Sequence, residues 1–488
     1  MTDYDVVSQL KSRGHDRLLI NGEWTPSSDG AEIEVLDPAT GAPIAAVPSG
    51  SEDDARSVVD AAAGAGGSWA ATTPLERGEI LRRAFEMMNE QAEPLARLIV
   101  FEMGKTFPEA MGEIRYAAEF FRWYSGEAVR NDGMIKMAPL GDKRIVAIHQ
   151  PVGVSLLITP WNFPAAMATR KIGPAIAAGC TMILKPSSDT PLTALAMGAL
   201  LEEAGLPPGV LNIFPSDRSS KVVPVMMNDP RVRKLSFTGS TEVGRVLLRD
   251  AADQIVNCSM ELGGNAPFLV FDDADIDAAV EGAMVAKMRN GGQSCIAANR
   301  FYVHAAVADE FNEAFSAAMG SIRVGPGLEE GVGLGPMINQ VAQHDMGQAV
   351  EAMAGAGARV SVGGRAPERP GFFFEPTVIE GVGSDEPALS REIFGPIAPI
   401  VTFETDEEAI ALANDTIHGL AAYVYSADLG RAMGVSEAIE TGMVGINRGL
   451  ISDPAAPFGG VKESGLGREG GHDGLQEFLE TKYIGVSW

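Results

Sequence analysis

The sequence predicts an α/β protein in which a mostly parallel sheet carries helices on both faces. From Val152 onward, short runs rich in β-branched and aliphatic residues alternate with longer stretches of helical pattern. Strands and helices that alternate in this way form βαβ units with parallel strands. A second alternation of the same kind begins near Glu261. Because 488 residues are too many for one hydrophobic core, we expect two or three domains.

The first alternation divides into short strands and longer helices. One expected helix starts at Pro191 and ends before Gly205, which is the usual placement of these residue types. Either Ser240 or Thr241 is the expected cap of the helix that runs to Asp253. The expected strands are 154–158, 181–184, 210–214 and 234–237, and the earlier helices are 165–178 and 191–204. A nucleotide would bind at the carboxyl ends of such strands.

The second alternation contains expected helices at 275–289 and 307–319, a strand at 301–303 and a glycine-rich loop at 325–336. Two further segments stand apart from it. Residues 133–149 alternate around Gly141 and Asp142, which indicates a hairpin that interrupts the first domain. The C-terminal run 476–486 is expected to pair with this hairpin or with another subunit.

Composition narrows the function classes. A net charge of −27 opposes binding to nucleic acid or to anionic membranes. The N-terminus is polar and acidic, and the apolar run 172–184, which Gly and Pro interrupt, is too short to span a membrane. Three widely spaced cysteines suit a reducing cytoplasm rather than a disulfide framework. We therefore expect a cytoplasmic protein.

Cys295 is the strongest candidate for a nucleophile. Cys180 and Cys258 lie in apolar runs and fit the pattern of small core residues, whereas Cys295 follows two glycines and two polar residues. Glycines allow the backbone to approach a ligand closely, and a thiolate attacks carbonyl carbon well. A buried, inert cysteine is the alternative that spacing alone leaves open.

Two further stretches have both a chemical and an ordinary interpretation. Glu261 precedes two glycines at a strand end, and is either solvated or a base whose pKa is raised by burial. Asn162, in the turn 159–164, is either an ordinary turn residue or an oxyanion donor.

A third stretch, 237–244, follows a strand and opens a helix, which suits pyrophosphate binding. It carries Thr241 where a dinucleotide fingerprint has its middle glycine, so a simple capped helix is equally consistent. The six histidines show no metal-ligand spacing, and we expect no metal. Spacing leaves a Cys/His hydrolase open, because such partners meet only in the fold.

Together these motifs resemble the NAD(P)-dependent aldehyde dehydrogenase superfamily over nearly the whole chain. The motifs that carry the resemblance are 159–164 (TPWNFP), 184–187 (LKPS), 237–240 (FTGS), 261–264 (ELGG), 292–295 (GQSC), 392–396 (EIFGP) and 457–460 (PFGG). The resemblance implies that Cys295 is the nucleophile, that Asn162 with the Cys295 amide forms the oxyanion hole, and that Glu261 activates water for deacylation. It implies NADP or NAD as cofactor, bound by Pro160, Trp161, Lys185, Ser188, Gly239, Ser240, Glu392 and Phe394.

The resemblance also implies an architecture. A Rossmann-type parallel cofactor-binding domain is expected at 1–130 and 150–260. An α/β catalytic domain is expected at 261–446, with 447–470 returning to the cofactor domain and the substrate site. A β-hairpin oligomerisation arm is expected at 131–149 and 471–488, which would make the protein a homo-oligomer, dimer or tetramer.

Within the superfamily the chain is most similar to bacterial succinate-semialdehyde dehydrogenases, on stretches 168–171 (ATRK), 287–290 (KMRN), 449–452 (GLIS) and 465–470 (GLGREG). This implies a short aldehyde with an anionic tail, whose carboxylate is bound by Arg170, Arg289 and Ser452. Guanidinium groups suit that task because they offer paired donors to a carboxylate.

Two positions bear on the alternatives. Arg448 either adds charge to the substrate pocket, which would favour sulfolactaldehyde, or forms an ion pair with an acidic residue such as Asp453. Glutarate semialdehyde is a further anionic aldehyde among the alternatives. Residues Ile296 and Ala297 follow Cys295, so no neighbouring thiol is present for a regulatory disulfide. A cysteine esterase or thioesterase that uses the same catalytic residues, with the cofactor site unused, is the alternative class.

Overall fold

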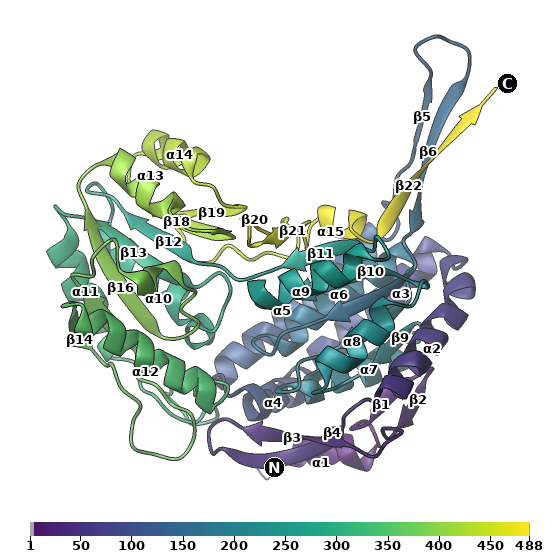
Figure 1. The fold of residues 1–488 in the computed structure, drawn as a ribbon, viewed down its shortest axis with the longest axis horizontal. Helices are drawn as coiled ribbons and strands as arrows, with labels where there is room; N and C mark the ends of the chain where they lie inside the picture. The colour runs from purple at the N-terminus through teal and green to yellow at the C-terminus, as the bar shows by residue number, and fades with distance from the viewer. Residues whose placement is uncertain (1–3, 488) are drawn as a thin grey trace.

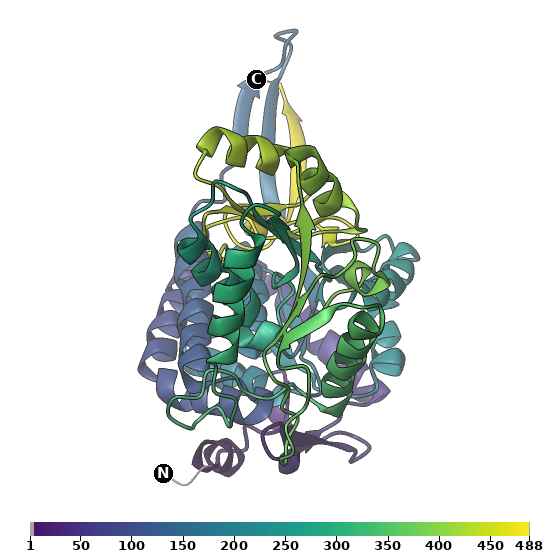
Figure 2. The ribbon, with the colours of Figure 1, turned by 90° about the vertical axis from the view of Figure 1, so that its left-hand side faces the viewer.

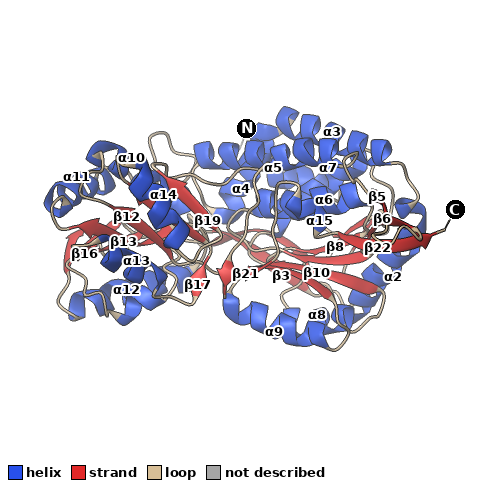
Figure 3. Cartoon of the chain, turned by 90° about the horizontal axis from the view of Figure 1, so that it is seen from above, coloured by secondary structure: helices blue, strands red, loops and turns tan. Residues whose placement is uncertain are grey.

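Two large β-sheets form the body of the protein, and a smaller sheet projects from one end (Figure 1). The structure is a computed structural model that describes residues 4–487. Residues 1–3 and 488, which belong to the expected domain ranges, lie outside the described residues. Seen from above, the two large sheets lie side by side with helices packed on their faces (Figure 3).

The first sheet has a central parallel part and antiparallel edges. In spatial order its strands are β2 (Glu23–Thr25), β1 (Leu18–Ile20), β9 (Leu211–Ile213), β8 (Met182–Lys185), β7 (Val154–Ile158), β10 (Val232–Thr238), β11 (Asn257–Glu261) and β21 (Gly465–Leu466). The strands from β9 to β11 are parallel. The strand order reverses between β7 and β10, which makes the carboxyl ends of these two strands a natural site for a nucleotide.

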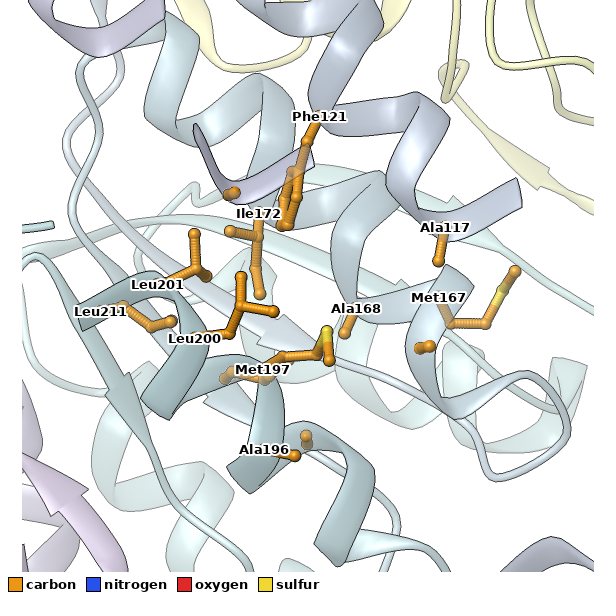
Figure 4. Close-up of a cluster of buried hydrophobic side chains, with 14 of the residues drawn as sticks. Ala117, Phe121, Met167, Ala168, Ile172, Ala196, Met197, Leu200, Leu201 and Leu211 are labelled. Carbon is orange, nitrogen blue, oxygen red and sulfur yellow. The ribbon is translucent and has the colours of Figure 1, made fainter. Parts of the chain in front are cut away.

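Helices cover both faces of this sheet. They are α1 (Asp5–Ser12), α2 (Glu52–Ala70), α3 (Pro74–Glu90), α4 (Ala92–Met103), α5 (Phe107–Glu127), α6 (Pro164–Ala178), α7 (Pro191–Glu203), α8 (Ser219–Met227) and α9 (Thr241–Ala252). Figure 4 shows side chains of α5, α6, α7 and β9, including Phe121, Ile172 and Leu200, meeting in one buried cluster. Each large apolar side chain buried there stabilises the fold by roughly 1.5–3 kcal/mol. The packing therefore holds α5 and α6 firmly, and both helices reach the site described below.

The second sheet is also mainly parallel. Its strands, in spatial order, are β14 (Arg359–Val362), β15 (Thr377–Glu380), β16 (Ile397–Phe403), β13 (Ala298–His304), β12 (Ala266–Val270), β18 (Ala421–Tyr425) and β19 (Met443–Ile446). The helices that accompany it are α10 (Ile276–Met288), α11 (Ala308–Gly320), α12 (Gln340–Gly355), α13 (Asp406–Asn414) and α14 (Leu429–Ala438). Short pairs β3–β4 (Glu32–Asp37, Ala42–Pro48) and β17–β20 (His418–Gly419, Val461–Lys462), the 3-10 turns Arg289–Gly292 and Pro387–Ser390, and α15 (Asp473–Gln476) complete the described fold.

The projecting sheet consists of β5 (Met134–Met137), β6 (Arg144–Pro151) and β22 (Leu479–Val486). It extends beyond the body of the molecule and carries the C-terminal strand (Figure 2). The expected hairpin around Gly141 is confirmed, and Gly141 adopts a φ of 70° in its turn. The C-terminal run pairs antiparallel with β6 of the same chain, which confirms the expected pairing with the hairpin.

The expected elements are confirmed with small shifts at their ends. The strand at 154–158 has the expected bounds, and Ser240, not Thr241, caps α9, because its Oγ accepts a hydrogen bond from the Val243 amide. The helix expected to reach Arg289 ends at Met288. Asn290 and Gly291 have positive φ angles of 56° and 61°, which a helix cannot accommodate.

Candidate active site

A cavity of about 210 Å³ lies between the carboxyl ends of the first sheet and the loops of the second. The turns after β7, β10 and β11 line one side, and the loop that follows α10 lines the other. The predicted site residues that line this cavity are Pro160, Trp161, Asn162, Arg170, Gly239, Ser240, Glu261, Arg289, Cys295, Glu392, Phe394 and Ser452. The fold thus brings together residues that lie hundreds of positions apart in the chain.

The loop that carries Cys295 is packed too tightly for side chains at its glycines. A Cβ on Gly292 would lie 2.2 Å from the Gly395 carbonyl oxygen, and Gly292 has a φ of 76°. A Cβ on Gly264 would lie 2.1 Å from the carbonyl oxygen of Cys295. The absence of side chains at these positions lets the backbone turn sharply and brings a partly accessible Cys295 to the cavity.

Burial sets the protonation of the two central groups. It raises the pKa of the Cys295 thiol to about 12, against the opposing effect of the Arg170 guanidinium. Glu261 is 3% exposed, and burial together with the nearby Glu469 carboxylate raises its pKa well above the usual range. Neither Glu261 oxygen has a hydrogen-bond partner among residues 4–487. A carboxyl with unpartnered oxygens and a raised pKa is, once ionised, a good base for a proton from water.

Asn162 is held through its backbone as well as its side chain. Its Nδ2 donates to the Gln293 carbonyl at 3.0 Å, two residues before Cys295. Its own carbonyl oxygen accepts hydrogen bonds from Lys105 Nζ at 2.8 Å and from Asn290 Nδ2 at 3.0 Å. These contacts fix the amide of Asn162 next to the loop of the thiol.

Lys105 is in turn fixed by Glu113 of α5. The two charged groups lie 2.5 Å apart, and both side chains are almost fully buried. The other Glu113 oxygen accepts hydrogen bonds from the Ala165 and Ala166 amides at the first turn of α6. One carboxylate therefore joins α5, α6 and the turn of Asn162.

The cavity has an arginine-rich side. Arg289 Nη1 donates to Ser452 Oγ at 3.4 Å, and its guanidinium lies 4.9 Å from the centre of the Phe163 ring. Arg170, fully buried, donates through Nη2 to Tyr116 Oη at 2.7 Å and lies 3.5 Å from a Glu469 oxygen. Both predicted arginines reach the cavity, but only Arg289 lacks a carboxylate partner there among the described residues.

Arg448 does not reach the cavity, in contrast to the expectation from its place beside the substrate loop. Its side chain is exposed, and Nε donates to the Leu450 carbonyl at 2.7 Å. This local bond turns the guanidinium along its own loop and away from the cavity. Within residues 4–487, no ion pair between Arg448 and an acidic side chain occurs either.

Aromatic and acidic groups form the opposite side of the cavity. The rings of Trp161 and Phe394 meet edge to face with centroids 5.4 Å apart. Glu392 Oε1 accepts a hydrogen bond from the Gly264 amide at 3.0 Å, and burial raises the pKa of this carboxyl to about 7. Ser240 places the N-terminus of α9 at the same side. A flat ring and a sugar hydroxyl would find suitable partners here.

Lys185 and Ser188 lie outside the cavity, near the carboxyl end of β8. Burial lowers the pKa of Lys185 to about 8. Its Nζ has no hydrogen-bond partner among the described residues. A mostly buried cation without a partner, on the strand next to the switch point, fits the hydroxyl or phosphate groups of a nucleotide.

Three contributing residues gave no signal in the sequence. Tyr116 lines the cavity. Lys105, which is paired with Glu113, donates a hydrogen bond to the Asn162 carbonyl. All three lie in or near α5, outside every motif recognised above.

No group of three or more His, Cys, Asp or Glu side chains in the described part of the chain is arranged to hold a metal ion. None of the helices within residues 4–487 has the length and apolar character needed to cross a membrane.

The comparisons with known proteins agree with this geometry. A succinate-semialdehyde dehydrogenase from Paenarthrobacter nicotinovorans is 52% identical over 444 residues, which cover 91% of this chain and 99% of the relative. A glutarate-semialdehyde dehydrogenase from Pseudomonas putida is 49% identical over 468 residues, covering 96% and 97% of the two chains. The crystal structure of an NADP-dependent enzyme from E. coli superposes with a TM-score of 0.96 at 48% identity and covers 97% of this chain and 98% of that one. Residues 24–484 match the aldehyde dehydrogenase family, so the chain belongs to that family, whose members oxidise aldehydes with NAD or NADP.

Proposed function

We propose that the protein oxidises a short aldehyde with a carboxylate at its far end, succinate semialdehyde foremost, to the corresponding acid. The observation that carries this proposal is the position of Arg289, which lines the same small cavity as Cys295 and is not neutralised there by a carboxylate. A guanidinium in a confined, partly apolar cavity favours an anion and disfavours a neutral tail. Relatives named for succinate and glutarate semialdehyde support the same substrate class.

The residues of the cavity suit nucleophilic catalysis. Cys295 ionises by releasing its proton to solvent, and the thiolate forms a carbon–sulfur bond with the aldehyde carbon, while the carbonyl oxygen becomes an oxyanion. Asn162 Nδ2 and the Cys295 amide donate to that oxygen. A nicotinamide cofactor held beside this carbon would supply the acceptor for its hydride. The remaining thioester is cleaved by a water molecule whose proton passes to Glu261, which releases the acid and the thiol.

We assign the cofactor to the carboxyl ends of β7, β8 and β10. In this proposal the edge-to-face pair of Trp161 and Phe394 restricts the position of the nicotinamide ring. Glu392 accepts hydrogen bonds from the ribose that is attached to the nicotinamide. Ser240 lies at the pyrophosphate, and the unpartnered Lys185 binds the adenosine ribose. These residues hold and orient the cofactor and exclude water from the reacting carbon.

Glutarate semialdehyde is the second candidate, because a relative with that name is almost as similar to this chain. It carries the same charged end on a chain that is one methylene longer. A change of one methylene in a fitted pocket alters kcat/KM by about 10-fold or more. The cavity is small enough for this difference to matter.

A substrate series tests the proposal. Reduction of NADP and NAD is followed with succinate semialdehyde, glutarate semialdehyde and butanal, which lacks the carboxylate. We expect kcat/KM for succinate semialdehyde to exceed that for butanal by at least about 100-fold. Equal values for the two would refute the carboxylate proposal, and a preference for glutarate semialdehyde would select the longer substrate.

We also propose that the protein is a cytoplasmic homo-oligomer. Ile135, Leu140 and Tyr483 are exposed on the projecting sheet, and association of subunits would cover them. A reducing compartment suits a catalytic thiol, which has to stay reduced. Light scattering should give a mass of two or four chains, and a monomer at micromolar concentration would contradict this assignment.

A further inference from the structure

We propose that Tyr423 is a positioning residue for the reaction, whose hydroxyl holds the turn that carries Cys295 by donating a hydrogen bond to the Ile296 carbonyl. This inference rests on the proposed function, because it takes Cys295 as the nucleophile, and it deepens that function. Tyr423 belongs to β18 of the second sheet and lies outside every motif recognised above.

Cys295 occupies a tight turn of the chain. The Ala297 amide donates to the Ser294 carbonyl at 3.0 Å, so residues 294–297 form a β-turn with Cys295 and Ile296 at its two central positions. The closing hydrogen bond joins only the two ends, and β-turns with the same closing bond differ in the direction of their central groups. The directions of the Cys295 thiol and amide therefore depend on contacts from outside the turn.

The chain is held firmly just before this turn. The Gln293 carbonyl accepts hydrogen bonds from Asn162 Nδ2 and Asn290 Nδ2, both at 3.0 Å. The Gln293 side chain adds a contact of its own, because its Oε1 accepts from the Ile338 amide at 3.0 Å. The segment that enters the turn is thus anchored to the loops of Asn162 and Ile338.

Tyr423 provides an anchor inside the turn. Its Oη donates to the Ile296 carbonyl at 2.7 Å, and both residues are buried. Within residues 4–487, no other hydrogen bond reaches the backbone of Cys295 or Ile296. The Cys295 amide therefore stays free for an oxyanion, while the hydroxyl of Tyr423 fixes the residue that follows.

The ring of Tyr423 has little freedom to move. β18 lies between β12 and β19, with Tyr423 opposite Phe268 on one side and Gly445 on the other. A Cβ on Gly445 would lie 3.2 Å from the Tyr423 ring and 2.8 Å from Ile451, so the lack of a side chain there lets the ring pack closely. Burial raises the pKa of the Tyr423 phenol above its usual range, so the hydroxyl keeps its proton and remains a donor.

The hydrogen bond acts on the chemistry through geometry. The Cys295 thiol has to meet the aldehyde carbon, and the Cys295 amide has to point at the oxygen that becomes an oxyanion. Loss of the anchor at Ile296 lets the turn rock and misdirects both groups. Glu392 and Phe394 lie on a different loop, so binding of the cofactor should not depend on this hydrogen bond.

The main test is Tyr423→Phe, which removes the hydroxyl and keeps the ring. We expect kcat to fall about 10-fold with succinate semialdehyde and equally with butanal, because the reacting group is the same in both. The KM for the cofactor should change by less than about 2-fold. Tyr425→Phe is the matched control, because its hydroxyl is on the same strand but lies against Gly282 of α10, where an added Cβ would meet it at 1.6 Å. The control should keep the wild-type kcat.

Two further measurements separate positioning from a merely structural role. The rate of the first turnover, followed by stopped-flow absorbance of the reduced cofactor, should fall about 10-fold in Tyr423→Phe. Inactivation by iodoacetamide needs the thiol but no oxyanion donor, so its rate should change by less than about 3-fold. Equal losses in the two rates would mean that the site has collapsed, and a lower urea midpoint with wild-type kcat would mean that the hydroxyl supports only the fold. Either result overturns the positioning role.

The pH dependence gives an independent check. Because the hydroxyl keeps its proton, the ratio of kcat between the wild type and Tyr423→Phe should stay constant from about pH 7 to about pH 9. A ratio that falls toward unity over this range would mean that the hydroxyl transfers a proton, which overturns a role in positioning alone.

A third variant separates this inference from the proposed function. If Cys295→Ala still oxidises succinate semialdehyde, the proposed chemistry is refuted and the role of Tyr423 fails with it. If Cys295→Ala is inactive and Tyr423→Phe behaves like Tyr425→Phe, only the role of Tyr423 is overturned.

Discussion

Replacement of Lys105 by methionine should separate the support of Asn162 from the chemistry itself. Lys105 Nζ makes two buried contacts, one with a Glu113 oxygen at 2.5 Å and one with the Asn162 carbonyl at 2.8 Å. Methionine has a similar length and keeps the apolar packing. It removes the charge and both hydrogen bonds.

The size of the stability loss follows from the partner that remains. Breaking a buried ion pair leaves an uncompensated charge and costs about 3–5 kcal/mol. Glu113 still accepts hydrogen bonds from the Ala165 and Ala166 amides, so we expect the lower end, about 3 kcal/mol. The double variant Lys105→Met/Glu113→Gln should regain part of that loss, because the orphaned charge disappears.

Lys105→Met should lower kcat less than removal of the oxyanion donor itself would. Removing such a donor costs about 100- to 1000-fold in kcat. In the Lys105 variant the Asn162 carbonyl keeps its bond from Asn290, so the amide is displaced rather than lost. We expect kcat to fall about 10-fold with little change in KM, and the double variant should not recover it.

Stability is measured by urea unfolding and activity by steady-state cofactor reduction with succinate semialdehyde. Lys11→Met, at an exposed position on α1, is the control for loss of one positive charge. An unchanged kcat together with the full stability loss would refute the reasoning, because Lys105 would then support only the fold.

Other predictions concern the chemistry and the cofactor. Glu261→Gln should give a burst of reduced cofactor equal to the enzyme concentration and almost no later turnover, and sustained turnover would remove Glu261 from deacylation. Arg289→Ala should cost about 2–4 kcal/mol in kcat/KM for succinate semialdehyde and much less for butanal, whereas equal losses would make this arginine structural. NADP should be used at least as well as NAD, and Ser188→Glu should shift the preference to NAD, because a carboxylate there would repel a 2′-phosphate. An unchanged ratio of the two kcat/KM values would place the selectivity elsewhere. The raised pKa of Cys295, about 12, keeps the thiol protonated at neutral pH in the free enzyme, so inactivation by iodoacetamide should accelerate about 10-fold per unit from pH 7 to 9. A rate that levels off below pH 8 would show that the thiol ionises more readily than its burial implies.

Much of the fold was predictable because its signals are local. The placement of Pro191 and Gly205 correctly indicated the ends of α7, and a cap at Ser240 or Thr241 correctly indicated the start of α9. Such signals depend on backbone geometry and hydrogen bonds within a few residues, which the sequence displays directly. The error at Arg289 is of the same kind, since the positive φ angle of Asn290 has no strong sequence signature.

The site was predictable only as far as its motifs reach. The stretches around Asn162, Glu261 and Cys295 each looked ordinary alone, and together they indicated one cavity, where the structure places all three. The arginines were harder to rank. The resemblance indicated Arg170, and only the position of Arg448 beside the substrate loop indicated the latter, because sequence shows the charge of a side chain and not its direction.

The sequence by itself determined the fold class, the order of the elements and the residues that carry the resemblance. The tertiary structure alone decided which charges are available to a ligand. Lys171 pairs with Glu469 across 298 positions, and the same carboxylate lies 3.5 Å from Arg170. Arg448 bonds to its own loop instead. The physical reason is that a charge acts through its distance to other charges and its exposure to water, and both depend on how remote segments pack.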